Sequence, residues 1–281
     1  MSSRLGGISK SLGLVLLTGL LATGTPEAAE NPARAPKVVL EYELHWRFLH
    51  ILTFTSTSRL DTAGTYRMET EAETVGVIDT FFPWKARSEA WGQVRGARLR
   101  PEEYHSRSHF RGEVQEVDVA YEANGPKVAI RGEILSDGDR APVPTIQQRG
   151  TLDPLTAVAE LSRSLTEGGR CQGRWPVFDG LRRYDLLYED LGPTTIPPSD
   201  NDPWVGEGRL CRVRFDLKGG QWRGEDRPEE DPSRVFVWLQ THSPELGPIP
   251  VRFRVEAERG ALDVHLAKAP TVVREGVEAT P

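Results

Sequence analysis

The sequence predicts a mainly β protein built on an antiparallel sheet, with one short helix. Three observations lead to this fold class. Apolar and polar residues alternate with a period of two along most of the chain, turn signals separate the alternating segments, and one segment has both a helix start and a helix stop. We count about a dozen strands in this way and find no strict internal repeat.

The first predicted strand, residues 38–46, illustrates the alternation. The side that we expect to be buried carries Val38, Leu40, Tyr42, Leu44 and Trp46. The opposite side carries Glu41, Glu43 and His45. One buried face and one wet face are typical of an antiparallel sheet. The turns predicted between later strands include Asn124-Gly125, Asp137-Gly138 and Arg259-Gly260.

The segment 154–166 has the signals of a helix. Asp153 offers an acceptor side chain at the N-cap, and Pro154 takes the first helical position, where its missing N–H costs nothing. Gly168-Gly169 ends the segment. We interpret Asp153 as a structural cap, and a catalytic carboxylate is the alternative.

The N-terminal residues have the outline of a secretory signal peptide. Arg4 and Lys10 are followed by an apolar run from Leu12 to Leu21, which is about half of the ~20 residues that a membrane-spanning helix needs. No second run of this length follows, so we expect an exported, soluble protein without a transmembrane segment. The predicted organisation is a signal peptide over residues 1–24, a flexible segment over 25–37, a single β-rich domain over 38–267 and a disordered tail over 268–281. Within the domain, residues 190–207 and 219–233 are expected to be irregular.

The charge balance excludes one class of partner. The chain has 35 Lys and Arg residues against 41 Asp and Glu residues, a formal net charge of −6. A dedicated nucleic-acid binder would carry an excess of basic residues or a basic patch, so we expect no nucleic-acid partner. The oligomeric state cannot be deduced from these numbers.

The two cysteines predict a disulfide bond. An exported chain enters an oxidising compartment, and an even cysteine count without a Cys-x-x-Cys spacing favours a structural bond over a redox or zinc site. Cys171 and Cys211 are the only pair in the chain. Two buried free thiols are the alternative.

Common catalytic signatures are absent from the sequence, which has no Gly-x-Ser-x-Gly, His-Glu-x-x-His or glycine-rich phosphate loop. His105 and His109 share one face of a predicted strand, and a metal-ligand interpretation is open to them. Arg107 between them would oppose a cation, so we favour solvated strand residues. We therefore expect no catalytic residues, no metal site and no cofactor.

Aromatic residues form the first candidate ligand site. Phe81, Phe82 and Trp84 lie around Pro83, directly after an apolar segment. An exposed apolar cluster marks a ligand groove or a partner surface. The alternative is that the rings plug the open end or edge of a strongly curved sheet, and both interpretations hold if the sheet closes around an apolar cavity.

Arg182 and Tyr184 form the second candidate. They follow Asp179-Gly180, which predicts a tight hairpin turn. The functional alternative is an anion clamp made by Arg182 and its neighbour Arg183. Adjacent strand residues face opposite ways, so these two arginines cannot hold one ligand from the same face.

A series of short motifs occurs in a defined order along the chain. They are Tyr42-x-Leu44, Gly64-x-Tyr66, Thr74-x-Gly76, Phe82-Pro83-Trp84, Asp153-Pro154-Leu155-Thr156-Ala157, Phe178-Asp179-Gly180-x-Arg182-Arg183-Tyr184-Asp185, Cys211-Arg212-Val213, Val237-Trp238-Leu239 and Pro250-Val251-Arg252. In this order the chain resembles the exported bacterial family "domain of unknown function 3108" over about residues 40–267, and its cysteines resemble the cysteine-bearing subset of that family.

The resemblance implies a periplasmic protein whose strongly curved antiparallel sheet forms an open or spiral barrel. By looser analogy, such a fold is similar to the half-barrel carriers of lipoproteins and lipids of the LolA type. The family offers no established catalytic residues. We therefore expect a non-enzymatic cell-envelope protein that binds an apolar or lipid-like ligand in its curved sheet. An envelope protein-interaction or assembly factor is the second hypothesis, and a hydrolase acting on envelope material is the third.

Overall fold

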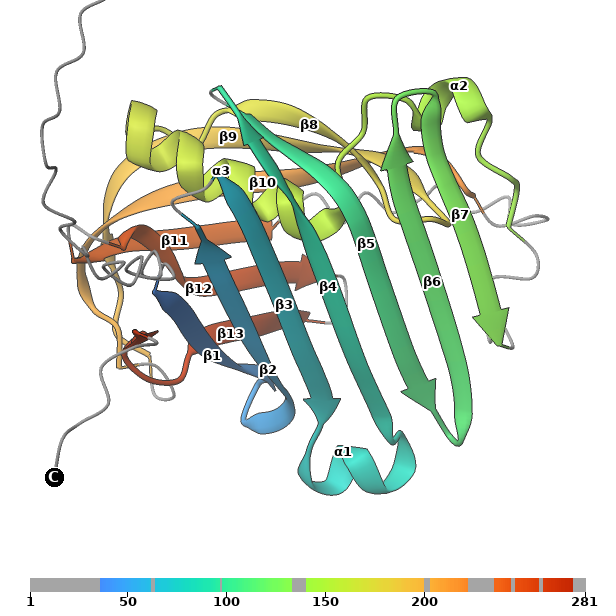
Figure 1. The fold of residues 1–281 in the computed structure, drawn as a ribbon. Helices are drawn as coiled ribbons and strands as arrows, with labels where there is room; N and C mark the ends of the chain where they lie inside the picture. Colours follow the sequence, from blue (N-terminus) through green and yellow to red (C-terminus); the bar gives the residue numbers. More distant parts are fainter. Residues whose placement is uncertain are drawn as a thin grey trace, which may run out of the picture. The chain divides into compact units, whose positions relative to one another are not determined.

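The computed structural model describes residues 36–61, 64–96, 98–132, 140–199, 203–221, 235–243, 246–257 and 260–274. Within them, 14 strands form one sheet, accompanied by three helices (Figure 1). The first seven strands are β1 (Lys37–Trp46), β2 (Leu49–Leu60), β3 (Thr65–Thr74), β4 (Trp84–Arg95), β5 (Arg98–Phe110), β6 (Glu113–Glu122) and β7 (Gly125–Gly132). The others are β8 (Gly173–Phe178), β9 (Arg183–Ile196), β10 (Gly206–Gly219), β11 (Val235–Ser243), β12 (Gly247–Ala257), β13 (Gly260–Leu266) and β14 (Thr271–Val273). The helices are α1 (Gly76–Phe81), α2 (Thr145–Gln148) and α3 (Pro154–Gly168).

The sheet consists of two antiparallel meanders joined along β1. Each strand pairs with the next from β1 to β7, and again from β8 to β13. β1 joins the meanders because it pairs with β13 as well as β2, and the short β14 pairs with the start of β1. β7 and β8 end the strand order among the described residues, so the sheet is not closed. The prediction of a mainly β fold with an open antiparallel barrel is confirmed.

The sheet curves until its two meanders meet at the β8–β9 turn, and Figure 1 shows β8 to β10 crossing behind β4 to β6. The Tyr121 hydroxyl on β6 donates a hydrogen bond of 2.6 Å to the Phe178 carbonyl at the end of β8. Gly180 in the turn has a φ of +93°, and a Cβ at this position would lie 2.4 Å from Val117 Cγ1. Only glycine satisfies both the backbone conformation and the close approach. The tight turn predicted here is therefore present.

Helix α3 lies between the two meanders and fills one end of the curved sheet. Leu161 and Leu165 are buried against β8 to β11, and the opposite flank of the helix, through Ala159, packs near Tyr66 and Met68. At its start, Asp153 accepts a 2.8 Å hydrogen bond from the Thr156 N–H, as predicted for an N-cap. The helix continues two residues beyond the predicted end at residue 166.

The predicted disulfide between Cys171 and Cys211 is present. It joins the segment after α3 to β10, with a Cα–Cα distance of 6.0 Å. Both cysteines are fully buried in the core that surrounds Leu161 and Leu165. The alternative of two free thiols is excluded.

The prediction of an irregular segment over residues 190–207 is wrong at both ends. β9 continues through Ile196, and β10 begins at Gly206 opposite it. Gly192 and Pro193 are residues typical of loops, which is why the sequence predicts one here. In the structure Gly192 (φ +94°) lies at an irregularity of the pairing between β9 and β10, where a strand can contain both residues.

Three smaller predictions also need correction. Residues 271–273, assigned to a disordered tail, form β14 and pair with Lys37–Val39. His45, expected on the wet face, is 8% exposed, whereas Trp46, expected in the core, is 41% exposed. Trp46 is the last residue of β1 and borders the turn, while the rings of two other histidines cover His45.

Some predictions concern residues outside the described ranges. These are the signal peptide over 1–24, the flexible segment up to residue 35, the turn at Asp137-Gly138, residues 222–233 of the irregular segment 219–233, Arg259 of the predicted turn with Gly260, and the tail from residue 275. The short helices α1 and α2 were not predicted. Among the residues that are described, no helix has the length and apolar character needed to cross a membrane.

Candidate functional site

The inner face of the sheet, which we define as the face that contacts α3, has two different halves. Toward α3 it carries large side chains that are buried, such as Tyr66, Met68 and Tyr104. Two and four residues further along the same strands, the inner face carries only small side chains that are partly exposed. These are Thr70, Ala72, Ala86, Ser88, Ser106 and Ser108. We call this second region the open half.

Helix α1 borders the open half at the end of the strands. It connects β3 to β4, and Thr74 fixes its return into the sheet: the Thr74 hydroxyl accepts a 2.9 Å hydrogen bond from the Trp84 N–H and lies 3.0 Å from the Phe82 carbonyl. Trp84 begins β4 and is half-buried, whereas Phe81 and Phe82 are 62% and 53% exposed. Two of the three predicted aromatic residues therefore point into solvent.

Other exposed apolar residues gather at the same end, because alternate turns of an antiparallel meander lie on the same side. The β1–β2 turn, α1 and the β5–β6 turn are all at the lower end in Figure 1. The first carries Phe48, 90% exposed, and α1 adds Val77, 54% exposed. Burying one such ring is worth about 1.5–3 kcal/mol. Leaving these apolar side chains exposed to water forgoes that stabilisation, and such exposed apolar groups are typical of binding surfaces.

An arginine accompanies the rings at two of these turns. Arg111, in the β5–β6 turn, lies 5.5 Å from the centre of the Phe82 ring and 5.1 Å from that of Phe110. Arg47, in the β1–β2 turn, lies 5.8 Å from the Trp46 ring. We call the group of Phe48, Val77, Phe81, Phe82 and Arg111 the aromatic rim. The combination of rings and cations suits an amphipathic ligand with an anionic head.

The structure does not bring Arg182 and Tyr184 to the aromatic rim. Arg182 pairs with Asp179 in the β8–β9 turn through a 2.9 Å hydrogen bond from Nε to Oδ2, and Tyr184 packs against the core around α3. Arg183 is engaged separately, because its guanidinium donates to Asp185 at 2.7 Å. Each arginine therefore has an internal carboxylate, which leaves the anion-clamp alternative without support.

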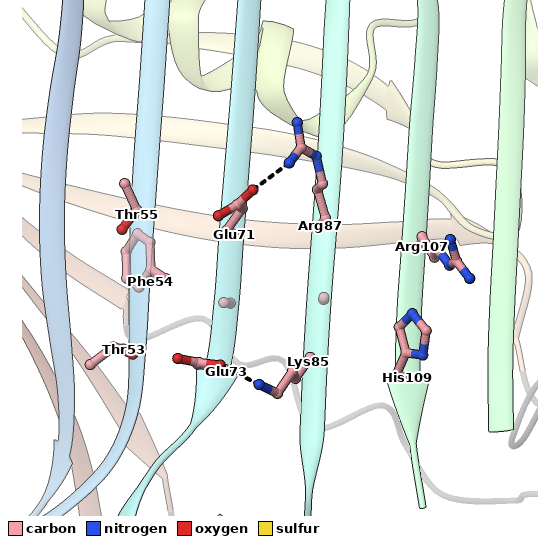
Figure 2. Close-up of a pocket in the computed structure, with 11 residues that line it drawn as sticks. Thr53, Phe54, Thr55, Glu71, Glu73, Lys85, Arg87, Arg107 and His109 are labelled. Carbon is pink, nitrogen blue, oxygen red and sulfur yellow. Dashed lines mark hydrogen bonds and ion pairs between the residues drawn. The ribbon is translucent and has the colours of Figure 1, made fainter. Parts of the chain in front are cut away.

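A hollow of about 440 Å³ lies over β2 to β5 (Figure 2). Phe54 stacks on Tyr42 of the inner face, with 4.5 Å between the ring centres. The charged lining residues are at the alternate strand positions, whose side chains point the other way. The hollow therefore lies on the outer face.

Part of its charge is paired within the hollow: Lys85 Nζ lies 2.8 Å from Glu73, and the hydrogen bond from this lysine raises its pKa. Arg107 pairs instead with Glu116, which is not among the lining residues. Ion pairs as exposed as these contribute little free energy and do not by themselves mark a ligand site.

The contacts of the two candidate histidines and of the capping aspartate agree with the structural interpretation of these residues. His105 Nδ1 pairs with Asp118, and His109 lines the outer hollow. Burial raises the pKa of Asp153 to about 6, but both of its oxygens accept hydrogen bonds from Thr156. The capping role leaves this carboxyl without a free face for catalysis.

Sequence reasoning missed three members of the aromatic rim, Phe48, Val77 and Arg111. Phe48 follows Arg47 in a turn, where an apolar residue has no core to enter, and this mismatch is the signal that could have identified it. Arg111 has no such signal, because its proximity to Phe82 depends on the pairing of β4 with β5.

Comparisons with known proteins agree with the fold and leave the activity open. No protein with a curated description matches the sequence. The structure is similar to the crystal structure of a beta-barrel-like protein of domain of unknown function DUF1849 from Brucella abortus, with a TM-score of 0.50 and 10% sequence identity over 85% of this chain and 98% of that chain. At this identity the likeness concerns the fold alone. The sequence over residues 41–267 matches the family described as "Protein of unknown function (DUF3108)", and the chain belongs to that family.

Proposed function

We propose that this protein is a non-enzymatic, periplasmic component of the cell envelope that binds an apolar or lipid-like ligand against the open half of its curved sheet. The aromatic rim is the observation that carries the proposal. It places exposed rings and a guanidinium at the end of the sheet beyond the small inner-face side chains of β3 to β5. An acyl chain lying along that face would contact Ala72 and Ala86, while its head group would remain near Arg111.

The two halves of the inner face support the location of the ligand. α3 occupies one half and leaves no space against Tyr104 or Met68, which are 7% and 8% exposed. The small side chains of the open half leave room above them, and a bound chain would cover surface that is now partly exposed.

The first experiment is native mass spectrometry of the protein purified from the periplasm, followed by organic extraction of bound material. We expect a discrete apolar adduct on the unmodified chain. The variant Phe82→Asp should lose most of it, because a carboxylate at the rim repels an anionic head group and wets the entrance. Ile146→Asp is the matched control, since Ile146 is also exposed (70%) but lies on α2 at the opposite end.

Loss of the adduct in Phe82→Asp alone would support the proposal. An unmodified chain that always carries a clean mass, including after incubation with lipid vesicles, would contradict it. Equal loss in both variants would also contradict it, because the effect would then be independent of the rim.

A role in protein interaction is the second candidate, favoured by strand β7. Among the described residues β7 pairs only with β6, and its Val128 and Ile130 are 37% and 38% exposed. An open strand can pair with a segment of a partner protein. Replacing Val128 with proline would remove a backbone donor from this strand, and unchanged partners after in-cell crosslinking would remove the support for this candidate.

A further inference from the structure

Three histidines and one glutamate meet on the face of β1 opposite the core. Glu43 and His45 lie two residues apart on β1, so they share a face. His50 on β2 is the pairing neighbour of His45, and His265 on β13 is the pairing neighbour of Glu43. Three adjacent strands, which Figure 1 shows side by side, therefore contribute to one group. We call these four residues the histidine cluster.

A local irregularity of the sheet produces the cluster. The register between β1 and β2 shifts between Leu44 and His45, so that Leu44 faces Leu52 but His45 faces His50. Without this shift, His45 would face Ile51. A bulge that re-aims a side chain is a feature often found beside functional sites. Here it brings the ring centres of His45 and His50 to 4.8 Å from each other.

The spacing of the polar atoms suits a metal ion. Glu43 Oε2 lies 3.2 Å from His45 Nε2 and 3.6 Å from His265 Nε2. Donor atoms of Glu43, His45 and His50 all lie within 4.8 Å of one another. Bonds of about 2.0–2.1 Å from zinc to nitrogen or oxygen give a tetrahedron with edges of about 3.3 Å, so two of these separations already match.

The hydrogen bonds of the histidines decide which ring nitrogen keeps a lone pair for a metal ion. His50 Nε2 lies 3.2 Å from the Leu52 carbonyl, which can only accept, so a neutral His50 keeps the lone pair on Nδ1. A backbone carbonyl in this role is the usual way in which proteins orient a ligating histidine. His45 Nε2, 3.2 Å from Glu43 Oε2, is the nitrogen of this ring that faces the cluster. Its other nitrogen, Nδ1, is buried without a hydrogen-bond partner in the described part of the chain and lies outside the ligand set.

The charged neighbours of the cluster, together with its own side chains, indicate which ion it would bind. On the acidic side, Asp263 is the pairing neighbour of His45 on β13. On the basic side, Arg252 is the pairing neighbour of His265 on β12, and its guanidinium lies 5.8 Å from the centre of the Trp238 ring on β11. Glu43 therefore lies on the side of His265 away from Arg252. Three imidazoles with one carboxylate are the ligands of zinc and similar transition metals, rather than of calcium or magnesium.

We propose that the histidine cluster binds one divalent transition-metal ion, with Zn²⁺ as the reference ion. Glu43, His45, His50 and His265 are its ligands. The other group of metal-ligating side chains among the described residues, Cys171, Asp190 and Cys211, is not a competitor while its two thiols form the disulfide. The proposal is independent of the apolar ligand, because the cluster lies on the opposite face of β1 from Tyr42 and the core.

The test uses untagged protein with its disulfide intact, stripped of metal by a chelator and titrated with ZnCl₂ against a chromophoric competitor. We expect one Zn²⁺ per chain and, with Co²⁺, the intense visible absorption of a four-coordinate site. Glu43→Gln and His50→Gln should each weaken Zn²⁺ binding by at least about tenfold, the smallest loss seen even when an outer partner of a ligand is removed. His109→Gln is the matched control and should leave binding unchanged.

Absence of bound Zn²⁺ at equimolar metal, in protein with an intact circular dichroism spectrum, would overturn the proposal. So would equal affinities in His50→Gln and His109→Gln, because the metal would then bind elsewhere. His50 is only partly buried and Glu43 is 36% exposed at its side chain, so both variants are expected to fold.

Discussion

The same three strands, β3 to β5, form a packed core at one end and an open face at the other. Near α3 they present Met68, Ala90 and Tyr104, all buried. Near α1 they present small residues such as Ala72 and Ala86. The strands alternate between the two faces in the same way in both halves, but the inner face changes from large buried side chains to Ala, Ser and Thr where α3 no longer covers it. A packed core and an accessible face are therefore divided along the length of a strand rather than between separate domains.

We call the half of the inner face that packs against α3 the covered half. Removing the disulfide in its core should produce the largest change in stability and should leave the ligand of the open half in place. Cys171 and Cys211 are separated by 40 residues, and a closed loop of this length contributes about 4 kcal/mol on the chain-entropy model. We expect the variant Cys171→Ala/Cys211→Ala to lose about this much free energy of unfolding in urea titrations. Its apolar adduct should persist whenever the variant is folded. A loss below 1 kcal/mol would mean that packing around α3 holds this half together without the bond.

Asp153 provides a test of the covered half that depends on pH. Burial raises the pKa of its carboxyl from 3.8 to about 6 in the folded chain. A carboxyl with a raised folded pKa binds its proton more tightly when folded, so it stabilises the fold fully below pH 4 and loses that contribution as pH rises from about 4 to 6. At 1.36 kcal/mol for each pKa unit, the loss is about 3 kcal/mol.

The expected measurement is the difference in unfolding free energy between the unmodified chain and Asp153→Asn. The unmodified chain should lose stability relative to Asp153→Asn as the pH rises from 4 to 6, and the difference should remain constant above about pH 7. Comparing the two proteins cancels the titration of all other groups. A flat difference across this range would show that the hydrogen bonds from Thr156 offset the cost of burial.

The sequence predicts the fold well because the determinants of the fold are local. Period-two alternation identifies strands, and Asp153-Pro154 with Gly168-Gly169 identifies α3 nearly to the residue. The prediction fails where pairing overrides local signals. Pro193 suggests a loop but lies in β9, because the facing β10 accommodates the irregularity at Gly192.

The candidate site could be predicted only in part, for the same reason. Phe81 and Phe82 are identifiable as an aromatic motif within one segment. Phe48 and Arg111 join them only because three alternate turns of the meander lie together. The histidine cluster was missed altogether, since its formation depends on a register shift in β2 and on the pairing of β1 with a strand far along the chain.

Two alanines on β4 allow the comparison to be tested within one strand. Ala90 is fully buried under α3, whereas Ala86, four residues earlier on the same face, is partly exposed in the open half. Inserting a larger side chain into a packed core costs about 1–3 kcal/mol, because neighbours must leave their preferred rotamers. We expect this cost for Ala90→Leu, and a change within about 0.5 kcal/mol for Ala86→Leu, as for substitutions at unpacked positions.

The ligand should respond in the opposite order. Ala86→Leu places a branched side chain where the acyl chain is proposed to lie, so it should reduce the adduct in native mass spectrometry while leaving stability unchanged. Ala90→Leu should retain the adduct in the fraction that folds. If Ala86→Leu is as destabilising as Ala90→Leu, the open half is packed as tightly as the covered half, and the division of the inner face into two functions is wrong.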